Sequence, residues 1–159
     1  MDRPLSPRRN SWRGAGSVSK PSEVVILAED QRQQRFVWRY LERAGYRWRQ
    51  IRRLPLPGGR GSGEQYVREQ YATQVSAYRD RASHARTALI IVIDADTQEI
   101  QHRTRQLAEA LSRARTEGRR EGEAIVHLIP KRNVETWVLC LSGKRMRKPT
   151  TETRPASTK

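Results

Sequence analysis

The chain has 159 residues, a formal net charge of +15, 35% apolar residues and 31% charged residues. This length accommodates one domain with one modest core, and the basic balance favours a polyanionic partner, nucleic acid before any other. The single cysteine, Cys140, excludes an internal disulfide framework and a cysteine-based zinc site. No apolar run approaches the roughly 20 residues that span a bilayer, and the N-terminus lacks an apolar secretory segment. We therefore expect a cytoplasmic protein with no membrane partner.

The two ends of the chain differ in composition from its middle. Residues 1–22 are rich in Pro, Ser, Gly and Arg and contain almost no aliphatic side chains, and residues 144–159 are similar. Such segments bury too little apolar surface to offset the entropy lost on ordering. The sequence predicts a disordered basic tail at 1–22, a folded domain at 23–143 and a flexible basic tail at 144–159.

The first half of the folded region alternates strand and helix patterns. The continuous apolar run at 23–29 is typical of a buried strand. A helix capped by Asp30 with Gln33 and stopped by Gly45 follows. Its inward face is expected to hold Phe36, Val37, Tyr40, Leu41 and Ala44. The alternation in residues 46–54 predicts a second, partly exposed strand.

A glycine-rich loop at 55–63 leads into the second half. Ser62 with Gln65 predicts the start of a second helix, whose apolar stripe is Val67, Tyr71, Val75 and Tyr78. Residues 87–93 are expected to form the third and most buried strand. A helix at about 97–116 follows, with Ile100, Leu107, Leu111 and Ala114 facing inward. A fourth strand at 123–129, a break at Pro130 and a last helix, "VETWVLCL", capped by Asn133, complete the domain.

This order of elements predicts an α/β fold with a four-stranded, mainly parallel sheet in a Rossmann-like three-layer arrangement. In such sheets ligands bind outside the carboxyl ends of the strands. Glu29, Asp94, Asp96 and the turn at Lys131 all fall at those ends. The sequence therefore places the candidate site at this edge of the sheet.

The acids at this edge predict a divalent metal site. If strand geometry persists, Asp94 and Asp96 lie roughly 6–7 Å apart on one side, and two such carboxylates repel each other unless a cation sits between them. Mg²⁺ or Mn²⁺ prefers oxygen ligands, and Glu29 supplies a third carboxylate. The alternative is architectural, because Asp96 with Glu99 also matches a helix capping box and Asp30 competes with Glu29 as the acid of its turn.

Two further features favour contact with phosphates or bases. Arg60, Gly61 and Ser62 precede a helix N-terminus, where backbone amides bind anions; a flexible connector is the alternative. Trp48 is flanked by arginines, a pattern that suits single-stranded nucleic acid, although a tryptophan is more often a core residue.

The segments "VVILAED" and "IIVIDAD" resemble the Toprim domain, the glutamate and D-x-D module of topoisomerases, primases and the overcoming-lysogenization-defect nucleases. The segments "GGRGSGEQYVREQY" and "IPKRNVETWVL" are similar to small stand-alone Toprim proteins, which are often encoded beside a partner ATPase in bacterial anti-phage modules. The resemblance covers residues 23–143. It implies a Toprim fold and metal-assisted hydrolysis of phosphodiester bonds, with DNA as the favoured polymer and an ATPase as a possible partner.

The resemblance also implies residue roles. Glu29 matches the family's metal ligand or general base, and Asp94 and Asp96 match its metal-binding aspartates. Glu99 is a possible further acid. The remaining roles fall in the "IPKRNVETW" turn: Lys131 neutralising a leaving phosphate, Arg132 contacting phosphate, and Glu135 serving a second metal or fixing Lys131 or Arg132.

Two rival functions remain open at the level of sequence. A haloacid-dehalogenase-like phosphatase also carries D-x-D after an apolar strand, but Gln98 stands where that family has Thr or Val, and no acidic pair follows the fourth strand. The other rival is a non-catalytic nucleic-acid-binding or adaptor subunit on the same fold.

Overall fold

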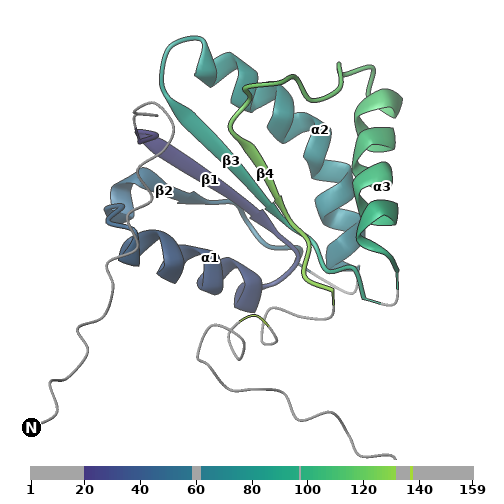
Figure 1. Cartoon of the computed structure of the whole chain (residues 1–159), viewed down its shortest axis with the longest axis horizontal. Coiled ribbons are helices and arrows are strands. Elements are labelled where there is room, and N and C mark those ends of the chain that lie inside the picture. The colour runs from purple at the N-terminus through teal and green to yellow at the C-terminus, as the bar shows by residue number, and fades with distance from the viewer. Residues whose placement is uncertain (1–19, 59–61, 97, 132–136, 138–159) are drawn as a thin grey trace, which may run out of the picture.

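The structure is a computed structural model that describes residues 20–58, 62–96, 98–131 and 137. It confirms the predicted α/β class, with a four-stranded sheet in the order β2-β1-β3-β4 whose paired strands all run parallel (Figure 1). The elements in chain order are β1 (Glu23–Ala28), α1 (Gln31–Arg43), the 3-10 turn η1 (Trp48–Gln50), β2 (Ile51–Arg53), α2 (Gly63–Ala82), β3 (Thr87–Val92), α3 (Ile100–Arg113) and β4 (Ile125–Leu128).

Helices cover both faces of the sheet, which makes three layers (Figure 1). On one face Val24 and Ile26 of β1 pack with Val37 of α1. On the other face Val25 and Leu27 of β1 pack with residues of α2 and α3. Successive strand residues point to opposite faces, so a strand covered on both sides must be apolar throughout. This explains the unbroken apolar runs of β1 and β3.

The chain reverses its direction of travel across the sheet at β1. From β1 it moves to β2 on one side, and the next crossover, through α2, carries it to β3 on the other side. The carboxyl ends of β1 and β3 therefore flank the topological switch point, where open α/β sheets form their ligand crevice. Glu29 follows β1 and Asp94 follows β3 at this point.

The second strand is shorter than the sequence predicts. Residues 48–50 form η1, and only Ile51–Arg53 pair with β1. Gln50 closes the turn, because its backbone N–H donates to the carbonyl of Arg47 at 2.9 Å and its side-chain oxygen accepts from the Arg47 N–H at 2.9 Å. The alternation of residue types carries no sign of this local bond, so the prediction of a strand over 46–54 was wrong in its first half.

The inward face of α1 differs from the predicted one. Val37 and Leu41 are buried as expected, but Gln33 and Gln34 are buried with them, and Tyr40 is exposed. The Gln34 side chain donates to the carbonyl of Leu54 at 2.8 Å, so hydrogen bonding allows a polar residue inside. Ala44, also predicted to face inward, is exposed.

The helix α2 matches its prediction. Val67, Tyr71, Val75 and Tyr78 are all buried, and Ser62 caps the helix, its hydroxyl accepting from the Gln65 N–H at 3.4 Å. The Tyr71 hydroxyl also lies 2.9 Å from Nε2 of His127 in β4. Burial lowers the pKa of His127 to about 4, so this histidine is a neutral packing residue near pH 7. No helix in the described part of the chain is long and apolar enough to cross a membrane.

The helix α3 begins later and buries a different set than the sequence predicts. It starts at Ile100 instead of about residue 97, and Ile100 and Ala114 are exposed although both were expected to face inward. Leu107 and Leu111 are buried as expected, together with Arg103. The predicted last helix lies, apart from Trp137, outside the described residues.

Candidate functional site

Glu29 and Asp94 meet at the switch point between β1 and β3. The two strands pair in register, with Ala28 opposite Val92, so the residues that follow them lie side by side. One carboxylate oxygen of Glu29 accepts a hydrogen bond from the backbone N–H of Asp94 at 2.8 Å. The neighbouring Asp30 instead caps α1, its carboxylate accepting from the Gln33 N–H at 2.9 Å. Glu29, and not Asp30, is therefore the acid that joins the site, and we call Glu29, Asp94 and Asp96 together the acidic edge.

The environment of the acidic edge raises the pKa of Glu29 to about 7. Burial is the main cause, because it disfavours the charged form, and the negative charges of Asp94 and Asp96 act in the same direction. The hydrogen bond from Asp94 and the charge of Arg103 oppose this rise. A carboxyl group with a pKa near 7 can take up or release a proton at neutral pH, which is the property that a general base or acid needs.

Asp96 lies in a turn and does not cap α3. Its φ of 51° is in the left-handed region, which Asp adopts more readily than most residues. Glu99 is the residue that precedes the helix, and its side chain makes no capping hydrogen bond. The alternative interpretation of Asp96 and Glu99 as a capping box is therefore wrong. The Asp96 side chain is 65% exposed, with one oxygen 4.0 Å from a guanidinium nitrogen of Arg103.

Lys131 is brought to the same edge by the chain that leaves β4. The backbone N–H of Ala95, the residue between the two aspartates, donates to the carbonyl of Pro130 at 2.9 Å. Lys131 is the next residue and is exposed. A lysine at this place can supply positive charge beside the acidic edge.

The start of α2 packs directly on Glu29. A Cβ added to Gly63 would lie 2.7 Å from the Glu29 carbonyl oxygen and 2.8 Å from its Cβ, so only glycine fits here without movement. Ser62, predicted to contact phosphate, is the capping residue of the same helix. The N-terminus of α2 therefore adjoins the acidic edge.

Arg103 is a member of the site that sequence reasoning missed. It is only 4% exposed, and its Nε donates to the carbonyl of Asp94 at 2.9 Å. It also forms an ion pair with Glu64 in the first turn of α2. Helical periodicity in the sequence could have identified it. Arg103 stands four residues before Leu107 and eight before Leu111, on the side of the helix that faces inward.

Other predicted site residues are not brought to this edge by the structure. Trp48 lies in η1, which precedes β2, whereas the acidic edge is formed by residues that follow the parallel strands. Glu99 is exposed, and its charge is not among the influences on the pKa of Glu29. Four predicted residues, Arg60, Gly61, Arg132 and Glu135, lie outside the described residues.

The acidic edge matches a hard divalent cation in ligand type. Within the described ranges, no group of three or more His, Cys, Asp or Glu side chains is arranged to hold a metal ion. Mg²⁺ in proteins is often held by one or two carboxylates together with water and substrate phosphates, so it does not need a complete cage of side chains. Glu29 and Asp94, which are joined by the hydrogen bond from the Asp94 backbone N–H to the Glu29 carboxylate, carry oxygen ligands of this kind.

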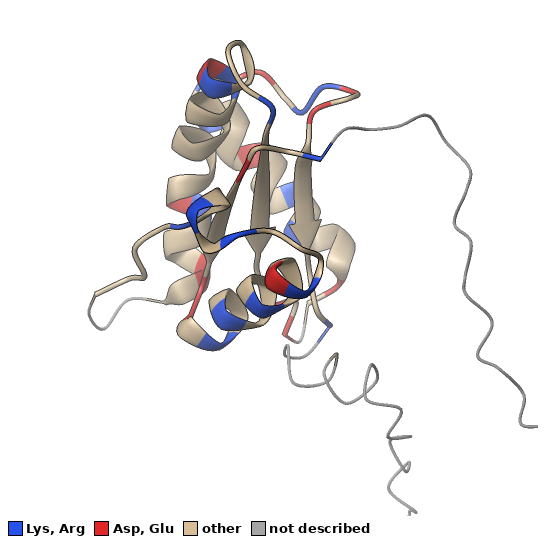
Figure 2. Cartoon of the chain, turned by 90° about the vertical axis from the view of Figure 1, so that its left-hand side faces the viewer, with Lys and Arg blue, Asp and Glu red and all other residues tan. Residues whose placement is uncertain are grey.

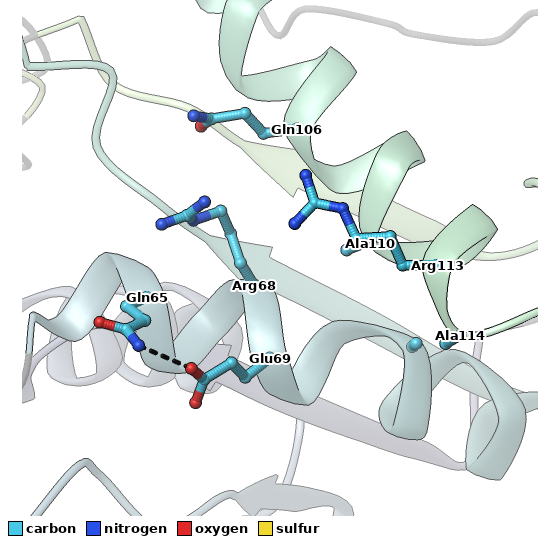
Figure 3. A pocket seen from close by; sticks show the side chains of 8 residues that line it. Gln65, Arg68, Glu69, Gln106, Ala110, Arg113 and Ala114 are labelled. Atoms are coloured by element: carbon cyan, nitrogen blue, oxygen red, sulfur yellow. Dashed lines mark hydrogen bonds between the residues drawn. The ribbon is translucent and has the colours of Figure 1, made fainter.

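An open groove of about 430 Å³ lies between α2 and α3 (Figure 3). Its two arginines are engaged by carboxylates, Arg68 with Glu64 and Arg113 with Glu109, each at 3.2 Å. Alanines of both helices also line it. With both of its cations engaged, the groove offers a weaker anion site than its residue types suggest.

No protein-family model, curated protein or solved structure matches this chain. The resemblance to Toprim domains stays a hypothesis carried by the residues quoted above. The functional assignment accordingly rests on the geometry of the acidic edge.

Proposed function

We propose that this protein is a nuclease that uses Mg²⁺ or Mn²⁺ to hydrolyse phosphodiester bonds, with DNA as the favoured polymer. The observation that carries the proposal is the 2.8 Å contact between the Glu29 carboxylate and the backbone of Asp94 at the switch point of the sheet. Asp96 follows in the next turn, and its charge reaches Glu29. The net charge of +15 supports a polyanionic substrate.

Glu29, Asp94 and Asp96 are the residues that would hold the metal. When bound, a divalent ion polarises the phosphate and lowers the pKa of its bound water. Asp94 and Asp96 alone could also carry the metal, and Glu29 would then accept the proton of the attacking water as a general base. Lys131 would neutralise charge on the leaving phosphate. Arg103 would be a positioning residue. It would fix the Asp94 carbonyl and balance the charge of the aspartates.

The proposal extends to the Toprim family. The order of a glutamate after β1 and two aspartates after β3 supports it, since this is the order of the motifs that the sequence resembles. By the same resemblance, the protein would act in a bacterial defence module beside an ATPase partner.

The test replaces Asp94 by Asn, which keeps its size and removes its charge. We expect Asp94→Asn to lose divalent binding in calorimetry and to cut nucleic acid at least about 100-fold more slowly, since even the partners of metal ligands are worth about 10–100-fold. Asp80→Asn is the matched control, because Asp80 is an exposed acid of α2. It should behave like the wild type in both assays.

A second variant separates ligation from architecture. Asn adopts the left-handed conformation as readily as Asp, so Asp96→Asn should fold normally and melt at an unchanged or slightly higher temperature without metal. It should nevertheless lose most metal-dependent cleavage. Full cleavage by Asp94→Asn would overturn the proposal. Wild-type protein that binds nucleic acid but cuts none with Mg²⁺ or Mn²⁺ would instead identify a non-catalytic binding subunit.

A further inference from the structure

The positive excess of the folded region is concentrated in one segment. Residues 31–53, which comprise α1, η1 and β2, hold eight arginines and a single acid, Glu42. The other described residues between 20 and 131 hold twelve Lys or Arg and thirteen Asp or Glu. Among the described residues, this one segment therefore carries the whole basic excess, and Figure 2 shows the blue positions along α1 and the adjoining η1–β2 segment.

The arginines of α1 form a single row. They occupy positions 32, 35, 39 and 43, a spacing of three, four and four residues that returns to the same side of a helix. The buried residues Gln33, Val37 and Leu41 hold α1 to the sheet by its other side, and all four arginines are exposed. At 1.5 Å per residue the row extends about 16 Å along the helix.

Seven of the eight arginines of residues 31–53 form no ion pair within the described part of the chain. They are Arg35, Arg39, Arg43, Arg47, Arg49, Arg52 and Arg53. By contrast, the arginines paired with carboxylates are Arg68, Arg79, Arg81, Arg103, Arg113 and Arg120. Exposed arginines without carboxylate partners are available to phosphates, which the guanidinium fork matches.

Tryptophans interleave with the arginines in this segment. Trp48 is 68% exposed, with the Arg49 guanidinium 5.1 Å from its ring centre. Arg53 of β2 lies 4.3 Å from the ring centre of Trp38 in α1, which joins the two elements. We call the α1 row together with Trp38, Trp48, Arg49 and Arg53 the arginine face. An exposed tryptophan beside arginines offers a flat apolar surface on which a base can stack.

We propose that the arginine face binds single-stranded nucleic acid, with phosphates on the α1 row and a base stacked on Trp48. Stacking requires a base outside a duplex, so an exposed tryptophan favours a single strand over a double helix. The arginine-rich, lysine-poor composition favours phosphodiester groups bound by guanidinium forks over diffuse attraction to a membrane surface. Arg32 stands at the N-terminal end of the row, in the helix that begins directly after Glu29 and Asp30. A strand lying along α1 would therefore have one end beside the acidic edge.

This inference deepens the proposed function, because it names the strandedness of the polymer and the surface that receives it. Binding to the face requires no hydrolysis, however. The test is therefore made in EDTA, so that loss of binding and loss of cleavage are separate results.

The experiment measures fluorescence anisotropy of the full chain with a labelled 20-nucleotide single strand and with the same sequence as a duplex. Arg39→Gln/Arg43→Gln removes two charges from the row, and Arg105→Gln/Arg119→Gln removes two exposed charges from elsewhere. We expect the first variant to bind the single strand at least tenfold more weakly than the second, and to lose about 1.4 in the slope of log affinity against log salt, near 0.7 per phosphate contact.

Trp48→Ala tests the stacking contact separately. It should weaken single-strand binding by about 5- to 150-fold, the range for one stacked base, while binding to the duplex changes little. Because Trp48 is mostly exposed, this variant should melt near the wild-type temperature. Equal losses in the two double variants, a wild-type preference for the duplex, or tighter binding to vesicles containing anionic lipid than to the single strand would each overturn the inference.

Discussion

At the scale of the residue, the surroundings of Glu29 disfavour the ionised form of its side chain. Its carboxylate accepts a hydrogen bond from Asp94, which favours the ionised form, yet burial and two nearby aspartates outweigh that bond and raise its pKa to about 7. A folded-state pKa above the ordinary value of 4.5 means that the folded chain binds the proton more tightly than the unfolded chain does. The contribution of Glu29 to the free energy of unfolding is therefore fully present below pH 4.5 and is lost as the pH rises through about 7.

The prediction for Glu29→Gln follows from that sign. Glutamine keeps the oxygen that accepts from Asp94 and removes the charge, so the variant should be more stable than the wild type at pH 8 and equally stable at pH 4.5. The expected gain at pH 8 is about 1–2 kcal/mol after allowance for solvent screening. Urea unfolding in EDTA at both pH values measures it.

Glu121→Gln is the matched control, because Glu121 is an exposed acid outside the site. It should show no such dependence on pH. A gain in Glu29→Gln that is the same at pH 4.5 and pH 8 would mean that charge is not its cause.

At the scale of the element, the contact between the start of α2 and the end of β1 sets the position of Glu29. Gly63 makes this approach possible, because its missing side chain leaves room for the Glu29 backbone. The first turn of α2 also supplies Glu64 to the ion pair with Arg103. Two helices and two strands are thus fastened together at the acidic edge.

Gly63→Ala should destabilise the protein, although alanine is the better helix former. The new Cβ would meet the Glu29 carbonyl oxygen at 2.7 Å, and forced shifts of this kind cost about 1–3 kcal/mol. The shift should also disturb Glu29 and lower cleavage. Gly118→Ala is the control, since nothing lies within 4 Å of its added Cβ. The prediction fails if the two variants unfold at the same urea concentration.

At the scale of the whole molecule, the charge is divided between the folded region and the ends of the chain. The N-terminal 19 residues hold four arginines and one aspartate. Lys20 and Ser22 belong to the fold, because Lys20 donates to the Ala44 carbonyl at 3.1 Å and the Ser22 hydroxyl to the Arg86 carbonyl at 2.8 Å. A deletion that is meant to spare the fold should therefore end at residue 19 and not at residue 22.

Deleting residues 1–19 should weaken nucleic-acid binding without changing which form of nucleic acid is preferred. Loss of four arginines should reduce the slope of log affinity against log salt by up to about 3 for a single strand. The preference for single strand over duplex should persist, because it belongs to the arginine face. Anisotropy titrations at several salt concentrations with both probes measure the two quantities. If the preference for single strand over duplex disappeared, residues 1–19 and not the arginine face would be its source.

The sequence by itself determined the class of fold and the edge that holds the acids. A parallel sheet whose strands are apolar throughout is covered by helices on both faces, and parallel strands deliver the residues that follow them to one edge. Glu29, Asp94 and Asp96 could be placed together for this reason. The cap of α2 was equally local, since Ser62 and Gln65 are near neighbours in the chain.

Only the tertiary structure decided which polar residues are buried and which apolar residues stay outside. Arg103 is inside because Glu64 and the Asp94 carbonyl meet it from other elements, whereas Ile100, the first residue of α3, is exposed. The tertiary structure also decided the raised pKa of Glu29 and the contact between Arg53 and the Trp38 ring. Each of these depends on groups far apart in the chain, and periodicity within one segment reports which side of an element is apolar but not what the other elements bring to it.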